Sequence, residues 1–211
     1  MGLTYREVKS MLDDKTSEII FSLTGWDERN QDQTLYQKVM EQMTPLYESY
    51  NIDPFMLRDY MVKRFSWAIP SWEAIKAIRS FGKDGILEVG AGNGYWSYLI
   101  NMNQHICTPC DKTPSKKWCV VKTTSSFMLK NNINKSLMLC WPCYAEEWSS
   151  NVLKSYLEKG GKKLIFIGEG RGGCTGSDSL HDLMDEMKTV EEVSIPRWFA
   201  IHDTMRLLEV Q

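Results

Sequence analysis

The sequence predicts an α/β fold: an open, mostly parallel sheet between layers of helices, with an antiparallel strand at the C-terminal end and a helical extension at the N-terminal end. From residue 86 onward, short apolar runs alternate with stretches of helical spacing, and each run ends in turn or polar residues. Such runs are typical of strands buried on both faces. Before residue 65 the regular pattern is helical. Alternating strands and helices favour an open sheet whose ligands bind at the carboxyl ends of the strands.

Length and composition limit the class of protein. A chain of 211 residues fits one domain with an extension. With 43% hydrophobic and 25% charged residues, the composition is that of a globular protein, which excludes disorder as the main state. The formal net charge of -2 argues against a protein that coats nucleic acid non-specifically, but it leaves room for local basic patches.

The sequence also indicates a cellular location. No apolar run approaches the ~20 residues that span a bilayer, so no membrane partner is expected. The first residues lack the apolar core of a secretion signal. Six cysteines without such a signal favour reduced thiols. These features predict an intracellular, cytoplasmic protein.

Residues 1–64 are predicted to form the helical extension. Four apolar residues recur at a spacing of four and so share one helical face, which we expect to be interrupted near Pro45: Leu35, Val39, Met43 and Tyr47. Asp53 and Pro54 suit the N-cap and first turn of a further helix that ends near residue 64. The extension has three open roles: a lid over a cofactor, a wall of a substrate pocket, or a contact in a homodimer.

Residues 65–211 are predicted to form the α/β domain. A linker over 65–70 leads into a helix over 71–82, in which Ile75 and Ile78 share a face and Gly82 is the C-cap. The predicted strands cover residues 86–89, 105–111, 136–144 and 162–170, followed by two strands after residue 190. The predicted helices between them cover residues 94–102, 145–159 and 177–188.

A glycine-rich turn follows the first predicted strand. Gly90, Gly92 and Gly94 permit a tight turn with positive φ and let a ligand approach the backbone closely. Such a turn before a helix N-terminus suits a cofactor that contains a nucleoside. The dinucleotide pattern Gly-x-Gly-x-x-Gly would require glycine at position 95, where the chain has Tyr95.

The segment over residues 86–96 resembles the first motif of class I S-adenosylmethionine (SAM)-dependent methyltransferases, which have a three-layer, Rossmann-like sheet. The resemblance extends over about residues 65–211. It implies that Glu88 lies near the methionine part of SAM and that Asp111, at the end of the next strand, binds the ribose hydroxyls. It also implies that four residues of the turn pack against the cofactor: Gly90, Ala91, Gly92 and Gly94. The alternative is a purely structural turn with a solvated Asp111.

An aromatic segment lies before this motif. Related methyltransferases often place such a segment beside the cofactor. The resemblance therefore implies that Phe65 or Trp67 covers the adenine or the methionine. A place in the hydrophobic core is an equal alternative for both.

Residues 140–144, Cys-Trp-Pro-Cys-Tyr, resemble a degenerate form of the [Asp/Asn/Ser]-Pro-Pro-[Tyr/Phe/Trp] motif of methyltransferases that act on amino groups of bases. The resemblance implies that Tyr144 stacks on a planar acceptor and that Pro142 offers its carbonyl. Trp141 stands where the motif has a polar acceptor, and an indole only donates hydrogen bonds, so adenine N6 methylation is in doubt. The alternative is a strand end packed with bulky residues.

Glu169 lies in a glycine-rich loop after the strand over 162–170. It is predicted to act as a general base or to bind an amine, with a solvated loop carboxylate as the alternative. Gly168, Gly170 and Gly173 fit the dinucleotide pattern, but the remaining chain is too short for the second half of such a sheet.

Cys107-x-x-Cys110 and Cys140-x-x-Cys143 could supply four thiolates to zinc. The stretch between the pairs is longer than usual for such a site, so buried cysteines are preferred and no metal is expected.

Taken together, the resemblance predicts methyl transfer from SAM to a nitrogen or oxygen nucleophile. Residues 140–144 and a lysine-rich segment over 112–135 favour a nucleic-acid or nucleotide acceptor, with a protein or small molecule as the alternative. Two other functions are a catalytically silent SAM-binding module and a zinc-stabilised interaction domain.

Overall fold

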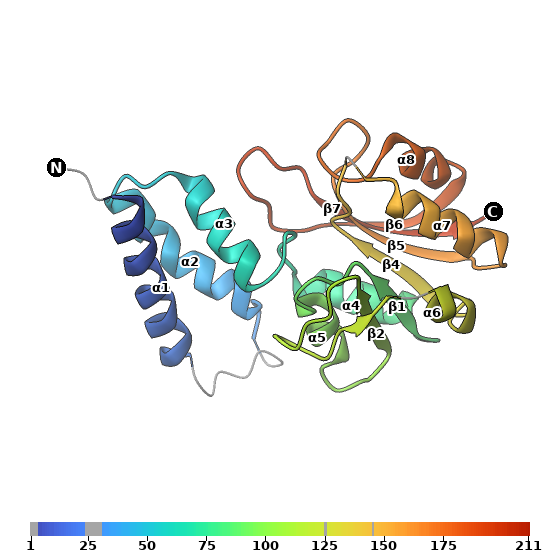
Figure 1. The fold of residues 1–211 in the computed structure, drawn as a ribbon, viewed down its shortest axis with the longest axis horizontal. Helices are drawn as coiled ribbons and strands as arrows, with labels where there is room; N and C mark the ends of the chain where they lie inside the picture. Colours follow the sequence, from blue (N-terminus) through green and yellow to red (C-terminus); the bar gives the residue numbers. More distant parts are fainter. Residues whose placement is uncertain (1–3, 24–30, 125, 145) are drawn as a thin grey trace.

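Seven strands form one sheet with helices on both faces (Figure 1). The computed structural model describes residues 4–23, 31–124, 126–144 and 146–211. Across the sheet the strands follow the order β3-β2-β1-β4-β5-β7-β6. Their bounds are β1 (Ile86–Val89), β2 (Cys107–Asp111), β3 (Lys122–Thr123), β4 (Ser136–Cys140), β5 (Lys163–Gly168), β6 (Met187–Ser194) and β7 (Thr204–Val210).

The predicted α/β class and the antiparallel C-terminal strand are confirmed. β1 pairs in parallel with β2 on one side and with β4 on the other. β7 runs antiparallel to both of its neighbours, β5 and β6. It is inserted between them, so β6 forms the outer edge. The carboxyl ends of β1, β2 and β4 therefore meet at one edge of the sheet.

Two apolar clusters cover the two faces of the sheet. Along β5, Ile165 and Ile167 belong to one cluster and Leu164 and Phe166 to the other, because successive side chains of a strand point to opposite faces. Helices α4 (Trp72–Phe81) and α5 (Tyr95–Asn101) cover the first face. Helices α7 (Trp148–Glu158) and α8 (Asp178–Asp185) cover the second, where α6 (Ser126–Asn131) lies near its edge.

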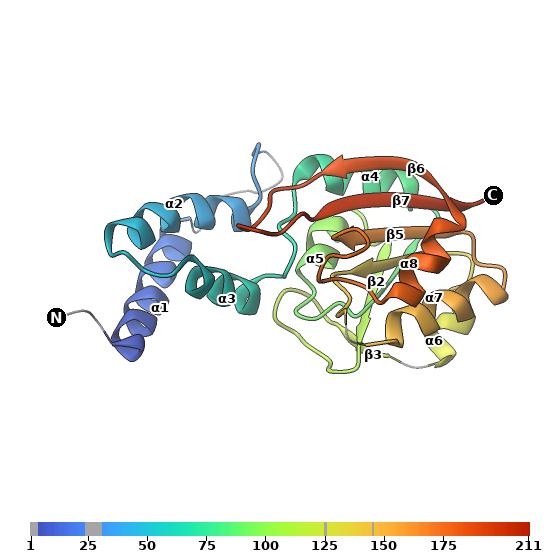
Figure 2. The same cartoon turned by 90° about the horizontal axis from the view of Figure 1, so that it is seen from above.

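In the described residues of the N-terminal part, three helices lie beside one end of the sheet (Figure 2). They are α1 (Tyr5–Ser22), α2 (Leu35–Ser49) and α3 (Pro54–Arg64). Thr4 and Thr34 open α1 and α2 with capping boxes, and the Asp53 side chain accepts the Phe55 N–H at the start of α3. In the described part of the chain, no helix is long and apolar enough to cross a membrane.

The expected interruption near Pro45 is wrong, because α2 continues through this residue. Proline removes one intrahelical hydrogen bond and crowds the preceding turn. The helix nevertheless keeps its apolar face, with Met43 and Tyr47 buried on the two sides of Pro45. Burial of this face outweighs the local cost.

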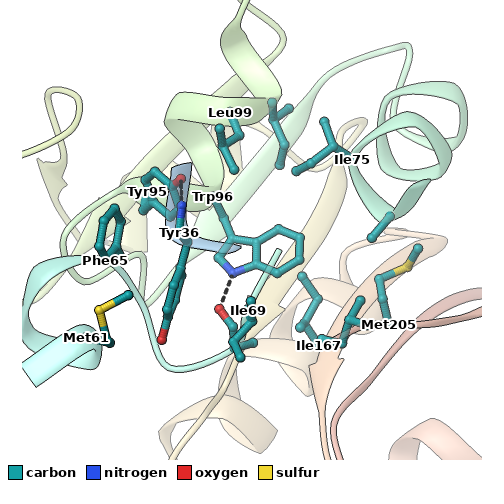
Figure 3. Close-up of a cluster of buried hydrophobic side chains, with 14 of the residues drawn as sticks. Tyr36, Met61, Phe65, Ile69, Ile75, Tyr95, Trp96, Leu99, Ile167 and Met205 are labelled. Carbon is teal, nitrogen blue, oxygen red and sulfur yellow. Dashed lines mark hydrogen bonds between the residues drawn. The ribbon is translucent and has the colours of Figure 1, made fainter. Parts of the chain in front are cut away.

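The N-terminal helices share a core with the sheet domain (Figure 3). Tyr36 of α2 stacks on Phe65, with ring centroids 4.8 Å apart. The Tyr36 N–H donates to the Tyr95 hydroxyl at 3.1 Å, and the Tyr36 hydroxyl donates to the Ser66 carbonyl at 3.1 Å. Trp96 of α5 lies among the buried side chains at the centre of the same view. A division of the chain into 1–64 and 65–211 remains a prediction.

Two short elements were not expected from the sequence, and one strand is shorter. β3 and α6 lie in the lysine-rich stretch, where apolar periodicity is weak. β4 ends at Cys140, so residues 141–144 follow the strand and do not extend it. This places the Trp-Pro-Cys-Tyr segment at the carboxyl edge of the sheet.

Candidate functional site

A cavity of about 160 Å³ lies at the carboxyl edge of the sheet, between the glycine turn and the linker that precedes α4. It brings together residues that are far apart in the sequence: the end of β1, the turn, the linker and the segment after β4. Seven of the predicted site residues line it: Phe65, Trp67, Glu88, Gly90, Ala91, Gly92 and Trp141. Gly94, Asp111, Pro142, Tyr144 and Glu169 do not line this cavity.

The three glycines of the turn have different surroundings. All have positive φ, at +80° for Gly90, +52° for Gly92 and +78° for Gly94. A Cβ at Gly90 would lie 2.6 Å from Cη2 of Trp148, and one at Gly94 would lie 2.7 Å from Sγ of Cys119. A Cβ at Gly92 would meet no described atom within 4 Å. Gly92 therefore presents bare backbone to open space at the cavity, where a ligand can pack against it.

Asp111 supports the turn from the neighbouring strand. Its Oδ2 accepts the Gly92 N–H at 2.9 Å, and its Oδ1 accepts the Thr113 N–H at 2.8 Å. A carboxylate has about four acceptor positions, so two remain after these bonds. Asp111 can therefore hold the turn and still accept hydrogen bonds from a vicinal diol.

Glu88, the third of the four residues of β1, lies on the wall of the cavity and is 1% exposed. Burial raises the pKa of its carboxyl to about 7; a hydrogen bond from the Ser97 hydroxyl opposes this rise, and the nearby Asp111 charge adds to it. Within the described residues no lysine or arginine forms an ion pair with Glu88. A bound cation beside this carboxylate would compensate its buried charge.

The end of α3 and the loop after β2 close over the turn. The Asn93 amide donates to the Lys63 carbonyl at 2.9 Å, and the Trp118 indole N–H donates to the Arg64 carbonyl at 2.8 Å. Val62, which precedes Lys63 in α3, lines the cavity. The N-terminal helices thus supply part of the cavity wall. The sequence held no signal for this contact, because it depends on how α3 docks.

Trp67 and Trp141 stack face to face on another wall, with ring centroids 4.3 Å apart and planes 7° from parallel. Trp67 is 41% exposed. Trp141 has a φ of +53°, and its indole N–H donates to both carboxylate oxygens of Asp203, at 3.0 and 2.9 Å. Asp203 is buried, and burial raises the pKa of its carboxyl to about 6. Asp203 could not be identified as a site residue from the sequence, because only the folded chain places it beside Trp141.

Phe65 lines the cavity but belongs mainly to the core. Its side chain is 1% exposed and stacks on Tyr36 and on Trp118. Of the two aromatic candidates before the turn, only Trp67 offers substantial surface to a ligand. Cofactor roles for both remain predictions.

The other residues of the Trp-Pro-Cys-Tyr segment lie apart from the cavity. The Pro142 carbonyl accepts the Gly176 N–H at 2.9 Å, and the Tyr144 side chain is 50% exposed. The segment therefore uses the indole N–H and a proline carbonyl within the chain. A stacking role for Tyr144 remains a prediction.

Glu169 lies on a separate, shallow cavity of about 530 Å³ formed with the glycine-rich loop and His202. Its Oε2 accepts the Cys174 N–H at 2.7 Å and the Cys174 thiol at 2.9 Å, and its Oε1 accepts the His202 N–H at 2.8 Å. Burial alone would raise its pKa, but these hydrogen bonds outweigh burial and lower it. The carboxylate thus joins two loops. Its predicted action as a base is untested.

The cysteine pairs do not gather around a metal position. All six cysteines are free, and the part of the chain that the structure describes contains no group of three His, Cys, Asp or Glu side chains that could hold a metal ion. Burial raises the pKa of the Cys107 and Cys140 thiols, whereas a metal binds the thiolate. The zinc hypothesis has no geometric support.

Comparisons with known proteins find matches among solved structures only. No protein-family model matches the chain, and no curated protein matches it. A magnesium protoporphyrin IX methyltransferase from Synechocystis with bound SAM is 9% identical, with a TM-score of 0.46 over 83% of this chain and 97% of that one. An N-methyltransferase from Bradyrhizobium japonicum is 15% identical, with a TM-score of 0.41 over 65% and 94%.

A third solved structure, a protein of the NADB-Rossmann superfamily from Streptococcus agalactiae, is 10% identical, with a TM-score of 0.45 over 69% of this chain and 71% of that one. These identities and TM-scores are too low to assign a function. The geometry of the site is therefore the basis for assigning a function.

Proposed function

We propose that this protein binds SAM at the glycine turn and transfers its methyl group to a nitrogen or oxygen nucleophile. The observation that carries the proposal is an unobstructed Gly92 backbone with two carboxylates near it: Asp111, which accepts the Gly92 N–H, and Glu88, which lines the same cavity. Asp111 keeps acceptor positions for the ribose diol, and Glu88 is a buried carboxylate without a cationic partner among the described residues. Hydrogen bonds that an ionised carboxylate accepts are stronger than hydrogen bonds between neutral groups.

The residues that line the cavity suit SAM, but the volume of the cavity is small for a ligand of this size. Ligand pockets usually enclose ~300–1,000 Å³, whereas this cavity encloses about 160 Å³. Trp67 forms a half-exposed wall on the linker between α3 and α4. Outward movement of this wall would enlarge the site without disturbing the buried β1 and β2.

The protein's contribution to the reaction is mainly one of position. SAM supplies a methyl group already activated by its sulfonium. Asp111 and the turn backbone would fix the nucleoside end, Glu88 the cationic end, and Trp67 with Trp141 would exclude water from the far wall. Alignment of the reacting atoms can supply about 7–11 kcal/mol of a barrier, so no acid–base pair is required.

The acceptor proposed here is a nucleic acid or a nucleotide. The exposed ring of Tyr144 follows β4 at the edge where ligands bind in such sheets. Its face is available to a planar group. Glu169, in the loop after β5, would bind an amino group or accept its proton once a hydrogen bond from Cys174 or His202 is released.

One observation favours a second candidate, a SAM-binding module without transferase activity. The indole of Trp141 and the carbonyl of Pro142 both make hydrogen bonds within the chain. If neither is released, the segment offers an acceptor molecule few hydrogen-bonding groups. Cofactor binding would then stabilise the fold or a partner complex.

Transfer of labelled methyl from SAM to RNA, DNA and lysate protein separates the two candidates. We expect label in nucleic acid with the wild type, and at least tenfold less with Tyr144→Ala at unchanged SAM affinity. The matched control is Tyr50→Ala, since Tyr50 is 55% exposed and lies at the far end of α2. Tyr60→Ala would not serve, because Tyr60 packs on the core. SAM binding without label in any fraction would establish the silent module.

A further inference from the structure

We propose that the rim of this cavity binds the sugar–phosphate backbone of a single-stranded nucleic acid. The basic rim consists of Lys63, Arg64, Lys112, Lys116 and Lys117. The inference rests on the proposed function, because it names the acceptor class of that same site. It adds a surface that the resemblance did not imply, since two of its members belong to the N-terminal helices.

Hydrogen bonds between the end of α3, the loop after β2 and the turn bring the rim together. The Lys117 ammonium donates to the Lys63 carbonyl at 2.6 Å. The next residue, Trp118, is bonded to the Arg64 carbonyl. Lys112 directly follows Asp111, whose carboxylate accepts the Gly92 N–H. The end of α3, with Lys63 and Arg64, therefore contacts the lysine-bearing loop after β2 beside the turn, although about 50 residues of sequence separate them.

The charges of the rim are not neutralised within the described structure. Lys63, Lys112, Lys116 and Lys117 are exposed, and none of the five rim residues takes part in an ion pair with another described residue. Burial lowers the pKa of Lys117, and the nearby Arg64 charge lowers it further. Like charges held this close repel one another. A row of anions would relieve that repulsion, and the phosphates along a nucleic-acid strand form such a row.

An aromatic surface lies beside the rim. The Trp67 ring lines the cavity and is 41% exposed, and the guanidinium of Arg58 lies 5.9 Å from its centroid. Single-stranded nucleic acids bind to surfaces that combine a basic path for the backbone with aromatic rings for the bases. Acidic peptides would satisfy the charges but offer no base to stack. The combination of rim and ring favours the nucleic acid.

Fluorescence anisotropy of a labelled single-stranded oligonucleotide tests the inference at several salt concentrations, with RNA and DNA versions. Lys112→Gln/Lys116→Gln removes two exposed charges that make no hydrogen bond with other described residues. The matched control is Lys154→Gln/Lys188→Gln, two exposed lysines on α7 and β6, away from α3. SAM affinity is measured for each protein by calorimetry.

We expect the wild type and the control to bind with an affinity that falls as salt rises. The rim variant should bind about tenfold more weakly, and its salt slope should be smaller by roughly 1.4, at about 0.7 per lost phosphate contact on a single strand. SAM affinity should be the same in all three.

Three results would overturn the inference: no binding of either oligonucleotide, equal loss in the rim and control variants, or equally tight binding of a poly-glutamate chain. If SAM still binds in any of these cases, the proposed cofactor site stands and only the rim fails. If the wild type does not bind SAM at all, the proposed function itself is refuted.

Discussion

Glu88 lies one residue before the end of β1 and Asp111 ends the neighbouring parallel strand β2, yet their environments suit them to different parts of a ligand. Glu88 is buried, and its pKa is raised to about 7. Asp111 is partly exposed and makes two backbone hydrogen bonds. A buried carboxylate gains most from a cation, whereas a half-exposed one can exchange water for sugar hydroxyls. Two carboxylates therefore supply different interactions, charge at one end of the ligand and hydrogen bonds at the other.

Glu88 should make the free protein less stable as the pH rises. Because the folded pKa of about 7 lies above the ordinary glutamate value of about 4.5 in the unfolded chain, the folded state holds this proton more tightly. The resulting stability is complete below pH 4.5 and lost as the pH approaches 7. Between pH 5 and pH 8, we expect the unfolding free energy of the wild type to fall by about 2–3 kcal/mol more than that of Glu88→Gln.

Urea denaturation at the two pH values measures this difference. SAM affinity supplies a second readout, since ionised Glu88 should favour a cation. Affinity should rise from pH 6 to pH 8 in the wild type and stay level in Glu88→Gln. Parallel pH profiles for the two proteins would contradict a titrating Glu88.

At the scale of elements, the strand-turn-helix unit over residues 86–101 could be predicted from sequence. Its apolar run, its glycines and its helical spacing are local, and local patterns decide such units. The surroundings of the turn could not be predicted. Trp148 and Cys119 fill the space beside Gly90 and Gly94, and both come from later segments. The same holds for Trp141, whose indole direction depends on Asp203, 62 residues further along the chain.

Alanine substitution at two glycines should separate folding from binding. In Gly90→Ala, the new Cβ meets Trp148 at 2.6 Å and the residue keeps positive φ. We expect a loss of about 2–4 kcal/mol of unfolding free energy. In Gly92→Ala, the cost is backbone strain alone, about 1 kcal/mol, but the methyl group lies where the ligand packs.

Thermal unfolding and SAM titration of both variants check this. Gly92→Ala should lose cofactor affinity by at least tenfold while it stays folded. Equal SAM affinity in Gly92→Ala and the wild type would show that no ligand contacts this face of the turn.

At the scale of the whole molecule, the N-terminal helices are part of the site's framework. α2 is joined to the linker and to α5 through Tyr36, and α3 ends over the turn. Composition and periodicity predicted helices in residues 1–64. They could not predict where the helices dock, because a helical pattern specifies which face is buried and not its partner.

Tyr36 offers a test of this junction. Tyr36→Phe removes one hydrogen bond to Ser66 and should cost about 1 kcal/mol. Tyr36→Ala also removes the ring stacked on Phe65 and should cost about 3–5 kcal/mol. Urea denaturation gives both values, and limited proteolysis shows where the chain opens. If the protease cleaves the Tyr36→Ala variant between α3 and α4 no faster than it cleaves the wild type, the helices are not held by this contact.

The central claim is that SAM lies over residues 90–94 with its ribose on Asp111. Calorimetric titration of SAM into the wild type, Asp111→Asn and Asp84→Asn tests it most directly, since Asp84 is an exposed acid in the turn before β1. We predict one bound SAM per chain, an affinity about 10–100-fold lower for Asp111→Asn, and no change for Asp84→Asn. Absence of binding in the wild type, or equal affinity in all three proteins, would contradict the claim.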